Sequence, residues 1–261
     1  MSWRFALTPK WIVRHVLVIA LVVTMILLAF WQLRRLDDKR TYRDLVAARQ
    51  EQPVADVGEV VPHGAPVDAR GVTDVLYRSV RAAGTYEAAD TVVVENRTFN
   101  AAPGAWILTP LRLDDGTGVV INRGFIGFDR AGDIVPPPPP EGRVTVEGLV
   151  FPSQRRGSFG PTDAPQGRLR ELARVDLERY ASQLGYGILP AYVQLVSTDP
   201  PERAGSRGEP QLVALGSPTP DLGPHLSYAV QWFIFTTIAA GGYVILLRRV
   251  ARDQFRQHLE V

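Results

Sequence analysis

Two uncharged apolar runs near the ends of the 261-residue chain constrain its fold more than any other feature. Residues 16–33 and 226–247 hold 18 and 22 residues, respectively, without a single Asp, Glu, Lys or Arg. A bilayer core about 30 Å thick needs roughly 20 apolar residues in a helix, so both runs are long enough to cross it. The sequence therefore predicts transmembrane helices at 16–33 and 225–247, with a loop domain of residues 34–224 between them.

The first apolar run is not typical of a cleaved signal peptide. The apolar stretch of such a peptide is about 7–15 residues long and is followed by a cleavage site of small residues. Here the run closes on the bulky and basic sequence FWQLRR at residues 30–35. We therefore expect the first run to remain in the protein as a membrane anchor.

The distribution of charge predicts the orientation in the membrane. Residues 1–15 carry three basic and no acidic residues, residues 248–261 carry four and two, and residues 34–224 carry 22 and 25. Short loops rich in Lys and Arg stay in the cytoplasm, so both tails are expected there and the loop domain outside. The high sequence pI of about 9.0 then reflects topology and argues against nucleic acid as a partner.

One charge cluster opposes this orientation. Several arginines and lysines between residues 34 and 43 follow the first helix on the side predicted to be outside. We base the predicted orientation on the second helix, because no Lys or Arg lies between Arg207 and Arg248. Arginine outnumbers lysine 27 to 2, which is typical of a GC-rich bacterium, so we expect the plasma membrane of a bacterial cell.

The loop domain shows mainly strand patterns. Runs rich in β-branched and aromatic residues, bounded by turn residues, predict strands at 76–86, 91–98, 106–113, 118–126, 143–150, 192–196 and 211–215. One short helix is expected at 176–184, with apolar residues on one face and Gly185 as its stop. The fold class predicted is a membrane protein of α+β type, whose extracytoplasmic domain is an antiparallel sheet or partly closed barrel.

The segments between these strands have their own signals. Residues 114–117 (DDGT) predict a tight hairpin, because Gly116 tolerates the positive φ that such turns need. Residues 136–140 are five prolines, which favour a stiff spacer over a ligand for a proline-binding module. We expect a helical continuation at 34–52 that ends at Pro53, an irregular segment at 54–74, and a basic loop at 153–170.

Catalytic chemistry has little support in the sequence. The chain contains no cysteine, and its four histidines, at positions 15, 63, 225 and 258, do not have metal-ligand spacing. No nucleophile elbow, P-loop or dinucleotide fingerprint is present. We therefore predict a protein that is not an enzyme and has no resident metal site.

The outer border of the predicted membrane gathers the residues with the most distinctive chemistry. On the second helix, His225, Tyr228 and Trp232 fall within about 60° of one face at 100° per residue. On the first helix, Arg34 and Arg35 follow the apolar run. An imidazole, aromatic walls and two cations suit haem, whereas an interfacial cap with the usual aromatic belt is the ordinary alternative. The sequence leaves both interpretations open.

Five motifs, in order along the chain, resemble the Surfeit-locus (Surf/Shy) family of cytochrome c oxidase assembly factors. They are WQLRR at 31–35, YRSVRAAGTY at 77–86, GAWILTPL at 104–111, DG at 115–116 with VINRGFI at 120–126, and HLSYAVQWF at 225–233. Two positions depart from the family pattern: Phe125 replaces a Trp, and Gln231 replaces a Thr. Gln231 is expected to add a polar group near the proposed haem pocket. The resemblance covers nearly the whole chain and includes the two-anchor layout.

This resemblance implies a membrane chaperone that helps to place haem a into the catalytic subunit of a haem–copper oxidase. It implies that His225 is the haem contact. Arg34 and Arg35 would then neutralise the propionates, and Tyr228 and Trp232 would wall the ring. The expected partners are cytochrome c oxidase subunits, haem a synthesis enzymes and membrane lipid, with haem a as a transient cofactor.

Two further expectations concern partners. Trp31, Gln32 and the segment Asn122-Arg123-Gly124 are candidates for docking an oxidase subunit. The alternative for that segment is a strand end where Gly124 relieves a bulge.

The second class of function is a permanent accessory subunit that binds no haem. Residues 239–242 (AAGG) allow the close helix contact that such a subunit would use.

Overall fold

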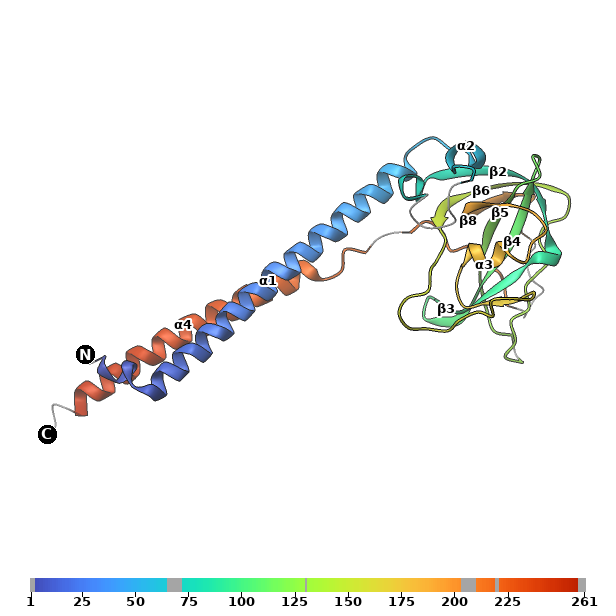
Figure 1. Ribbon diagram of the computed structural model, residues 1–261. Coiled ribbons are helices and arrows are strands. Elements are labelled where there is room, and N and C mark those ends of the chain that lie inside the picture. The colour runs from blue at the N-terminus through green and yellow to red at the C-terminus, as the bar shows by residue number, and fades with distance from the viewer. Residues whose placement is uncertain (1–2, 65–71, 130, 203–209, 219–220, 258–261) are drawn as a thin grey trace. The chain divides into compact units, whose positions relative to one another are not determined.

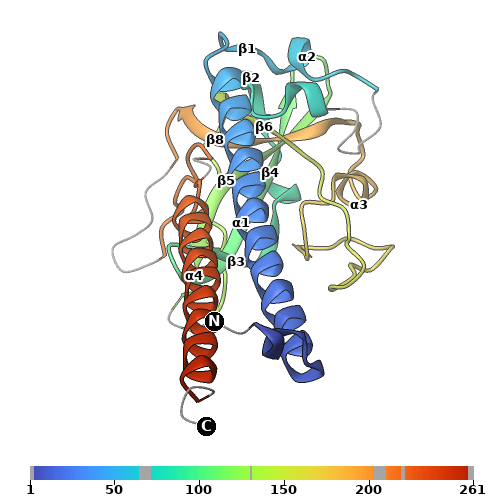
Figure 2. The ribbon, with the colours of Figure 1, turned by 90° about the vertical axis from the view of Figure 1, so that its left-hand side faces the viewer.

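The computed structural model describes residues 3–64, 72–129, 131–202, 210–218 and 221–257 (Figures 1 and 2). It divides into two compact units. The helical unit comprises Met1–Asp44 and Thr219–Val261, and the β unit comprises Leu45–Pro218.

The helical unit contains two long helices that meet the length and hydropathy expected of membrane spans. They are α1 (Pro9–Gln50) and α4 (His225–Gln257), and their most apolar windows have mean hydropathies of 2.7 and 1.7. A short 3-10 helix, η1 (Arg4–Leu7), precedes α1. The two predicted anchors are therefore confirmed as helices that could span a bilayer. The predicted continuation beyond residue 33 is also helical, as far as Gln50.

The two helices lie side by side and run in opposite directions (Figures 1 and 2). Ala29 and Ala229 are fully buried, although most side chains of this unit are exposed. The rings of Phe30 and Phe233 meet edge to face, with centroids 5.8 Å apart. Small residues at a helix contact let the backbones approach closely, so dispersion contacts hold the pair together without a hydrophobic driving force.

The β unit is built on one sheet of eight strands in the order β1-β2-β6-β8-β5-β4-β3-β7. An additional pairing of β2 with β4 closes β2, β6, β8, β5 and β4 into a barrel. The strands are β1 (Ala55–Asp56), β2 (Ser79–Tyr86), β3 (Val92–Phe99), β4 (Ala102–Leu113), β5 (Gly118–Gly127), β6 (Arg143–Pro152), β7 (Glu171–Leu172) and β8 (Ile188–Asp199). The predicted β-rich domain with a barrel-like sheet is therefore confirmed.

Most strand pairs are antiparallel, but three are parallel: β1–β2, β3–β7 and β5–β8. Parallel neighbours need a crossover connection, and that of β5 to β8 runs through β6, β7 and the helix α3 (Leu177–Ala181). Hydrophobic alternation along a strand does not reveal the direction of its neighbour, so the sequence did not predict these pairs.

The hairpin and the helix formed where they were expected. Gly116 has φ +83° in the turn between β4 and β5. The Asp176 carboxylate caps α3 by accepting a hydrogen bond of 3.0 Å from the backbone N–H of Arg179. The helix ends at Ala181, three residues earlier than predicted.

Two sequence-based expectations for the loop domain need correction. The predicted strand at 211–215 is wrong, because only Val213 pairs, in an isolated bridge with Phe125. The segment 54–74 is not wholly irregular, since it includes β1, the one-turn helix α2 (Val57–Val60) and the 3-10 turn η2 (Thr73–Val75). Residues 65–71 of that segment lie outside the described residues.

Two apolar layers enclose the wall of the barrel. The barrel interior holds one cluster, to which β2 contributes alternate residues such as Val80 and Ala82. A second cluster lies on the other side of the sheet, where Leu177 and Tyr180 of α3 pack against Val120 and Leu108. Strand β5 is covered on both faces, which explains why it is buried along nearly its whole length.

Closure of the barrel requires a glycine at position 84. A Cβ atom built there would lie 2.1 Å from the carbonyl oxygen of Arg112, where β2 pairs with β4. We expect Gly84→Ala to lower the free energy of unfolding by about 1–3 kcal/mol, because the strands must separate. The measurement is the thermal melting of the full chain in detergent, followed by circular dichroism. Gly127→Ala is the control, since, apart from its chain neighbours, no described residue lies within 4 Å of its Cβ position. Equal melting temperatures for the two variants would contradict this assignment.

Candidate functional site

The candidate site lies at the end of the helix pair where α4 begins. Pro224 precedes the helix, and its carbonyl oxygen accepts hydrogen bonds from the Ser227 hydroxyl and the Tyr228 backbone N–H. The first backbone N–H groups of a helix have no partner within it and carry a partial positive charge. His225 is the first residue of α4, so its imidazole is placed at this end.

His225 contacts the other helix through Gln32. The imidazole Nδ1 lies 2.8 Å from the Gln32 Oε1 atom. An amide oxygen can only accept a hydrogen bond, so Nδ1 carries the proton that it donates. In a neutral imidazole the other nitrogen, Nε2, then presents a lone pair. No described residue hydrogen-bonds to that nitrogen.

Gly223 keeps the same edge of the imidazole clear. It has φ +66°, a left-handed conformation that glycine adopts without strain, and its N–H donates to the Asp221 carboxylate. A Cβ atom at position 223 would lie 3.5 Å from both Cδ2 and Nε2 of His225. A larger residue would therefore crowd the nitrogen that bears the lone pair.

A second histidine contact joins the helices at their opposite end. His15 Nδ1 lies 2.7 Å from the Tyr243 hydroxyl, and His15 Nε2 lies 3.1 Å from the Ala6 carbonyl oxygen. The carbonyl can only accept, so Nε2 donates to it and Nδ1 accepts from Tyr243. Both nitrogens of His15 are thus occupied, in contrast to His225.

The two histidine contacts are separated by roughly the thickness of a hydrocarbon core. His15 and Gln32 are 17 residues apart on α1, and His225 and Tyr243 are 18 residues apart on α4. At 1.5 Å per residue the separation is about 26 Å. The polar groups of the helix pair therefore bond to one another at both borders of its apolar stretch.

The remaining predicted site residues are exposed to different degrees. Tyr228 is 48 % exposed, and Trp232 is half-buried and meets Phe235 edge to face at 6.0 Å. Trp31 is 56 % exposed. Arg34 and Arg35 are exposed, and neither forms an ion pair or hydrogen bond with any residue in the described ranges. The guanidinium groups are therefore free to bind an anion.

One expectation about this helix face changes. Gln231, which departs from the family pattern, was expected to add a polar group near the pocket. Six residues along α4 place it about 240° around the helix from His225, and it is exposed. It therefore lies on another face of the helix.

The second predicted cluster, Asn122-Arg123-Gly124, lies inside the β unit. The register between β4 and β5 shifts where Ile107 pairs with Gly124 but Leu108 pairs with Asn122, so Arg123 is the extra residue of a bulge. Asn122 and Arg123 are almost completely buried. The expected docking role of these residues therefore has no support in the structure, whereas the alternative role at a bulge does.

Arg123 joins three parts of the β unit. Its guanidinium forms a bidentate ion pair with Glu202, with N–O distances of 2.8 and 2.5 Å, and donates to the carbonyl oxygens of Pro137 and Pro138. These bonds fix the proline run against the barrel. Burial, helped by the Glu202 carboxylate, raises the pKa of the nearby Tyr86 phenol well above its usual value, and the Arg123 charge opposes this shift.

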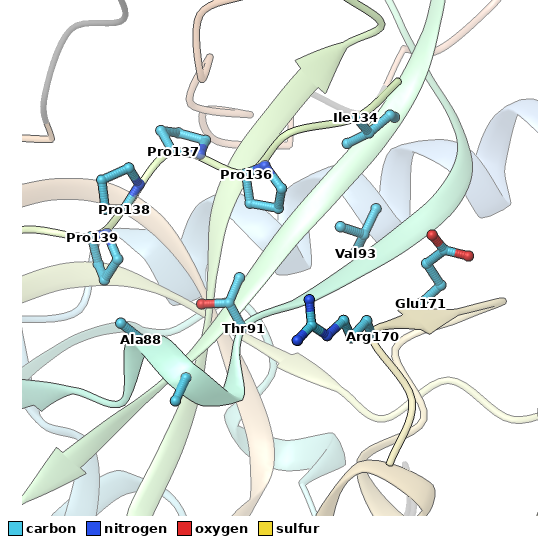
Figure 3. A pocket seen from close by; sticks show the side chains of 11 residues that line it. Ala88, Thr91, Val93, Ile134, Pro136, Pro137, Pro138, Pro139, Arg170 and Glu171 are labelled. Atoms are coloured by element: carbon cyan, nitrogen blue, oxygen red, sulfur yellow. The ribbon is translucent and has the colours of Figure 1, made fainter. Parts of the chain in front are cut away.

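A pocket of about 550 Å³ is lined in part by the proline run (Figure 3). Pro136 to Pro139 form one wall, and Thr91, Val93 and Arg170 form the opposite one. The pocket is open to solvent, and no three His, Asp or Glu side chains in the described parts of the chain gather as a metal site, here or elsewhere. The residues that line the pocket do not form a group of reactive side chains. The end of the helix pair where α4 begins therefore remains the stronger candidate.

Comparison with known proteins identifies the family. A family model described as the SURF1 family matches residues 19–237, which is most of the chain. The chain belongs to the SURF1 family. The matched span runs from within α1, through the whole β unit, and into α4 beyond Trp232, so it includes every residue of the candidate site.

Individual SURF1-like proteins are also similar over nearly their whole length. Uncharacterized SURF1-like proteins of Mycobacterium bovis and of two strains of Mycobacterium tuberculosis are each 26 % identical over 245 residues. The alignment covers 91 % of this chain and 83 % of each relative. The resemblance inferred from five short motifs is therefore confirmed at the level of the family. SURF1 is a family of oxidase assembly factors rather than of catalysts.

The internal role of Arg123 in this SURF1 protein is testable by stability. Removing one member of a buried ion pair leaves an uncompensated charge and costs about 3–5 kcal/mol. We expect Arg123→Met to lower the free energy of unfolding by that amount in thermal melts of the full chain. Arg81→Met is the matched control, because the Arg81–Glu147 pair is exposed and such a pair contributes at most about 1 kcal/mol. Equal losses would show that the Arg123 pair is not an internal support.

Proposed function

We propose that this SURF1 protein is an assembly factor for a haem–copper cytochrome c oxidase, and that it assists delivery or insertion of haem a into the catalytic subunit. The single observation that carries the haem part is the state of His225. Its Nδ1 is held by Gln32, and its Nε2 has no partner among the described residues. Neutral imidazole in this state is the form that ligates iron.

The residues around His225 suit the chemistry of haem. Haem is flat and apolar with two carboxylates, and its iron takes an axial nitrogen ligand. His225 would supply that ligand, while Tyr228 and Trp232 offer aromatic surface on the same helix. Arg34 and Arg35, which pair with no residue in the described ranges, carry charges that would neutralise the carboxylates. A single protein ligand also suits a carrier that must release its cargo.

The proposed setting is the plasma membrane of a bacterium, with both tails in the cytoplasm and the β unit outside. The charge of the tails supports this orientation, because Arg248, Arg249 and Arg252 directly follow the apolar stretch of α4. Oxidase subunits and haem a synthesis enzymes would be the partners. Trp31, at the outer border of α1 and exposed, is available for such contacts.

Haem content tests the proposal. The full chain would be co-expressed with the enzymes that make haem a, purified in mild detergent, and compared by absorption spectroscopy with His225→Ala. We expect the variant to lose most of the haem, because the iron loses its protein ligand. His15→Phe is the matched control: it removes the other membrane-border histidine, keeps a ring against Tyr243, and should retain haem. Equal haem content in wild type and His225→Ala would refute the assignment.

A second candidate function is a permanent accessory subunit of the oxidase that binds no haem. One observation favours it: apart from the local backbone of α4 itself, a Cβ atom on Gly241 or Gly242 would meet no atom of the described residues within 4 Å. This small-residue segment of α4 is therefore open to a partner helix. Stoichiometric recovery with mature, haem-loaded oxidase would favour the subunit, whereas enrichment on oxidase lacking haem would favour the assembly factor.

A further inference from the structure

We infer that Gln32 is the positioning residue of the site: its side-chain oxygen selects the His225 tautomer that exposes Nε2, and fixes the direction of the ring. This inference deepens the proposed function and rests on it where haem is concerned. The contact itself is a property of the haem-free chain and can be measured without any ligand.

The argument begins with the chemistry of the two side chains. The Gln32 oxygen accepts at 2.8 Å from Nδ1, so the proton of the neutral ring is placed on Nδ1. A free imidazole without such an acceptor favours the tautomer that carries its proton on Nε2. In that tautomer Nε2 has no lone pair to offer to a metal. Histidines that ligate metals almost always donate their other ring N–H to an oxygen, which fixes both tautomer and orientation.

The surroundings of the two residues favour one arrangement. Gln32 and His225 are both half-buried and lie on different helices, so the hydrogen bond also fixes the ring relative to α1. The buried Ala29 on α1 and Ala229 on α4 lie one turn away from them, and such small residues allow the helix backbones to approach closely. The small Gly223 leaves the Nε2 edge clear. The hydrogen bond sets the tautomer and the direction of the ring, the alanines allow the two helices to lie close together, and Gly223 leaves room beside Nε2.

The contrast with His15 shows that the arrangement is specific. Both membrane-border histidines bond to the opposite helix, but the Tyr243 hydroxyl donates to His15, while the Gln32 oxygen accepts from His225. His15 consequently has the opposite tautomer, and its Nε2 proton is engaged by Ala6. Both ring nitrogens of His15 are thus hydrogen-bonded at one border, whereas Nε2 of His225 has no partner among the described residues at the other.

Nitrogen NMR of the haem-free full chain tests the tautomer. The four histidines would be labelled with ¹⁵N, and the His225 signals assigned by their absence in His225→Ala. Protonated and unprotonated ring nitrogens resonate in separate regions of the spectrum. We expect Nδ1–H in the wild type and in Gln32→Glu, which keeps an oxygen acceptor, and a majority of Nε2–H in Gln32→Leu. Gln231→Leu, on another face of α4, is the control and should match the wild type.

Two results would overturn the inference. One is an Nε2–H tautomer in the wild type, which would mean that the Gln32 amide group presents its N–H to the ring. The other is an unchanged Nδ1–H tautomer in Gln32→Leu, which would mean that Gln32 does not decide it.

Haem a binding by the same variants separates this inference from the proposed function. Loss of an outer oxygen partner typically weakens metal affinity 10- to 100-fold, so we expect Gln32→Leu to hold haem a that much more weakly. Gln32→Glu should restore binding. Because a carboxylate accepts more strongly than an amide, its haem should also have a lower reduction potential. A wild-type chain with the Nδ1–H tautomer that binds no haem a would support the contact and refute the proposed function.

Discussion

The hydrogen bond between Gln32 and His225 is the interaction on which the candidate site depends. It joins the two helices through residues that are 193 positions apart in the chain, and it lies where the apolar stretches of both helices begin or end. Within a bilayer, polar side chains are costly unless they are paired. The pairing therefore has two consequences: it fixes the register of the helices, and it leaves one nitrogen of the imidazole available.

The β unit depends on a different interaction, that of an arginine buried in the wall of the barrel. The bulge in β5 turns Arg123 away from the surface, and Glu202 with two proline carbonyls satisfies its guanidinium. A buried charge is tolerated when it is paired and hydrogen-bonded. This network fixes the proline run that lines the pocket of Figure 3. The unit is thus supported by long-range polar contacts as well as by its apolar layers.

Features set by neighbouring residues could be predicted from the sequence, whereas features set by distant partners could not. The two membrane helices followed from the length of their apolar runs, and the hairpin at Gly116 followed from its need for positive φ. The burial of Arg123 depends on Glu202, 79 residues away, and a lone arginine in a strand is ordinarily expected at the surface. The parallel pair of β5 and β8 likewise depends on a crossover that no local pattern encodes. His225 was recognised by its position, but its hydrogen bond to Gln32 was not predicted, because helix spacing describes one helix and not the register of two.

The central claim is that α1 and α4 place Gln32 and His225 at the same outer border of the membrane. Labelling of single cysteines tests it most directly. The chain contains no cysteine, so Arg35→Cys, Asp221→Cys and Arg252→Cys would each carry one reactive thiol, at exposed positions. Intact spheroplasts would be treated with a membrane-impermeant maleimide. The account predicts that positions 35 and 221 react without lysis and that position 252 reacts only after lysis. Reaction of 35 and 221 from opposite sides of the membrane would contradict it.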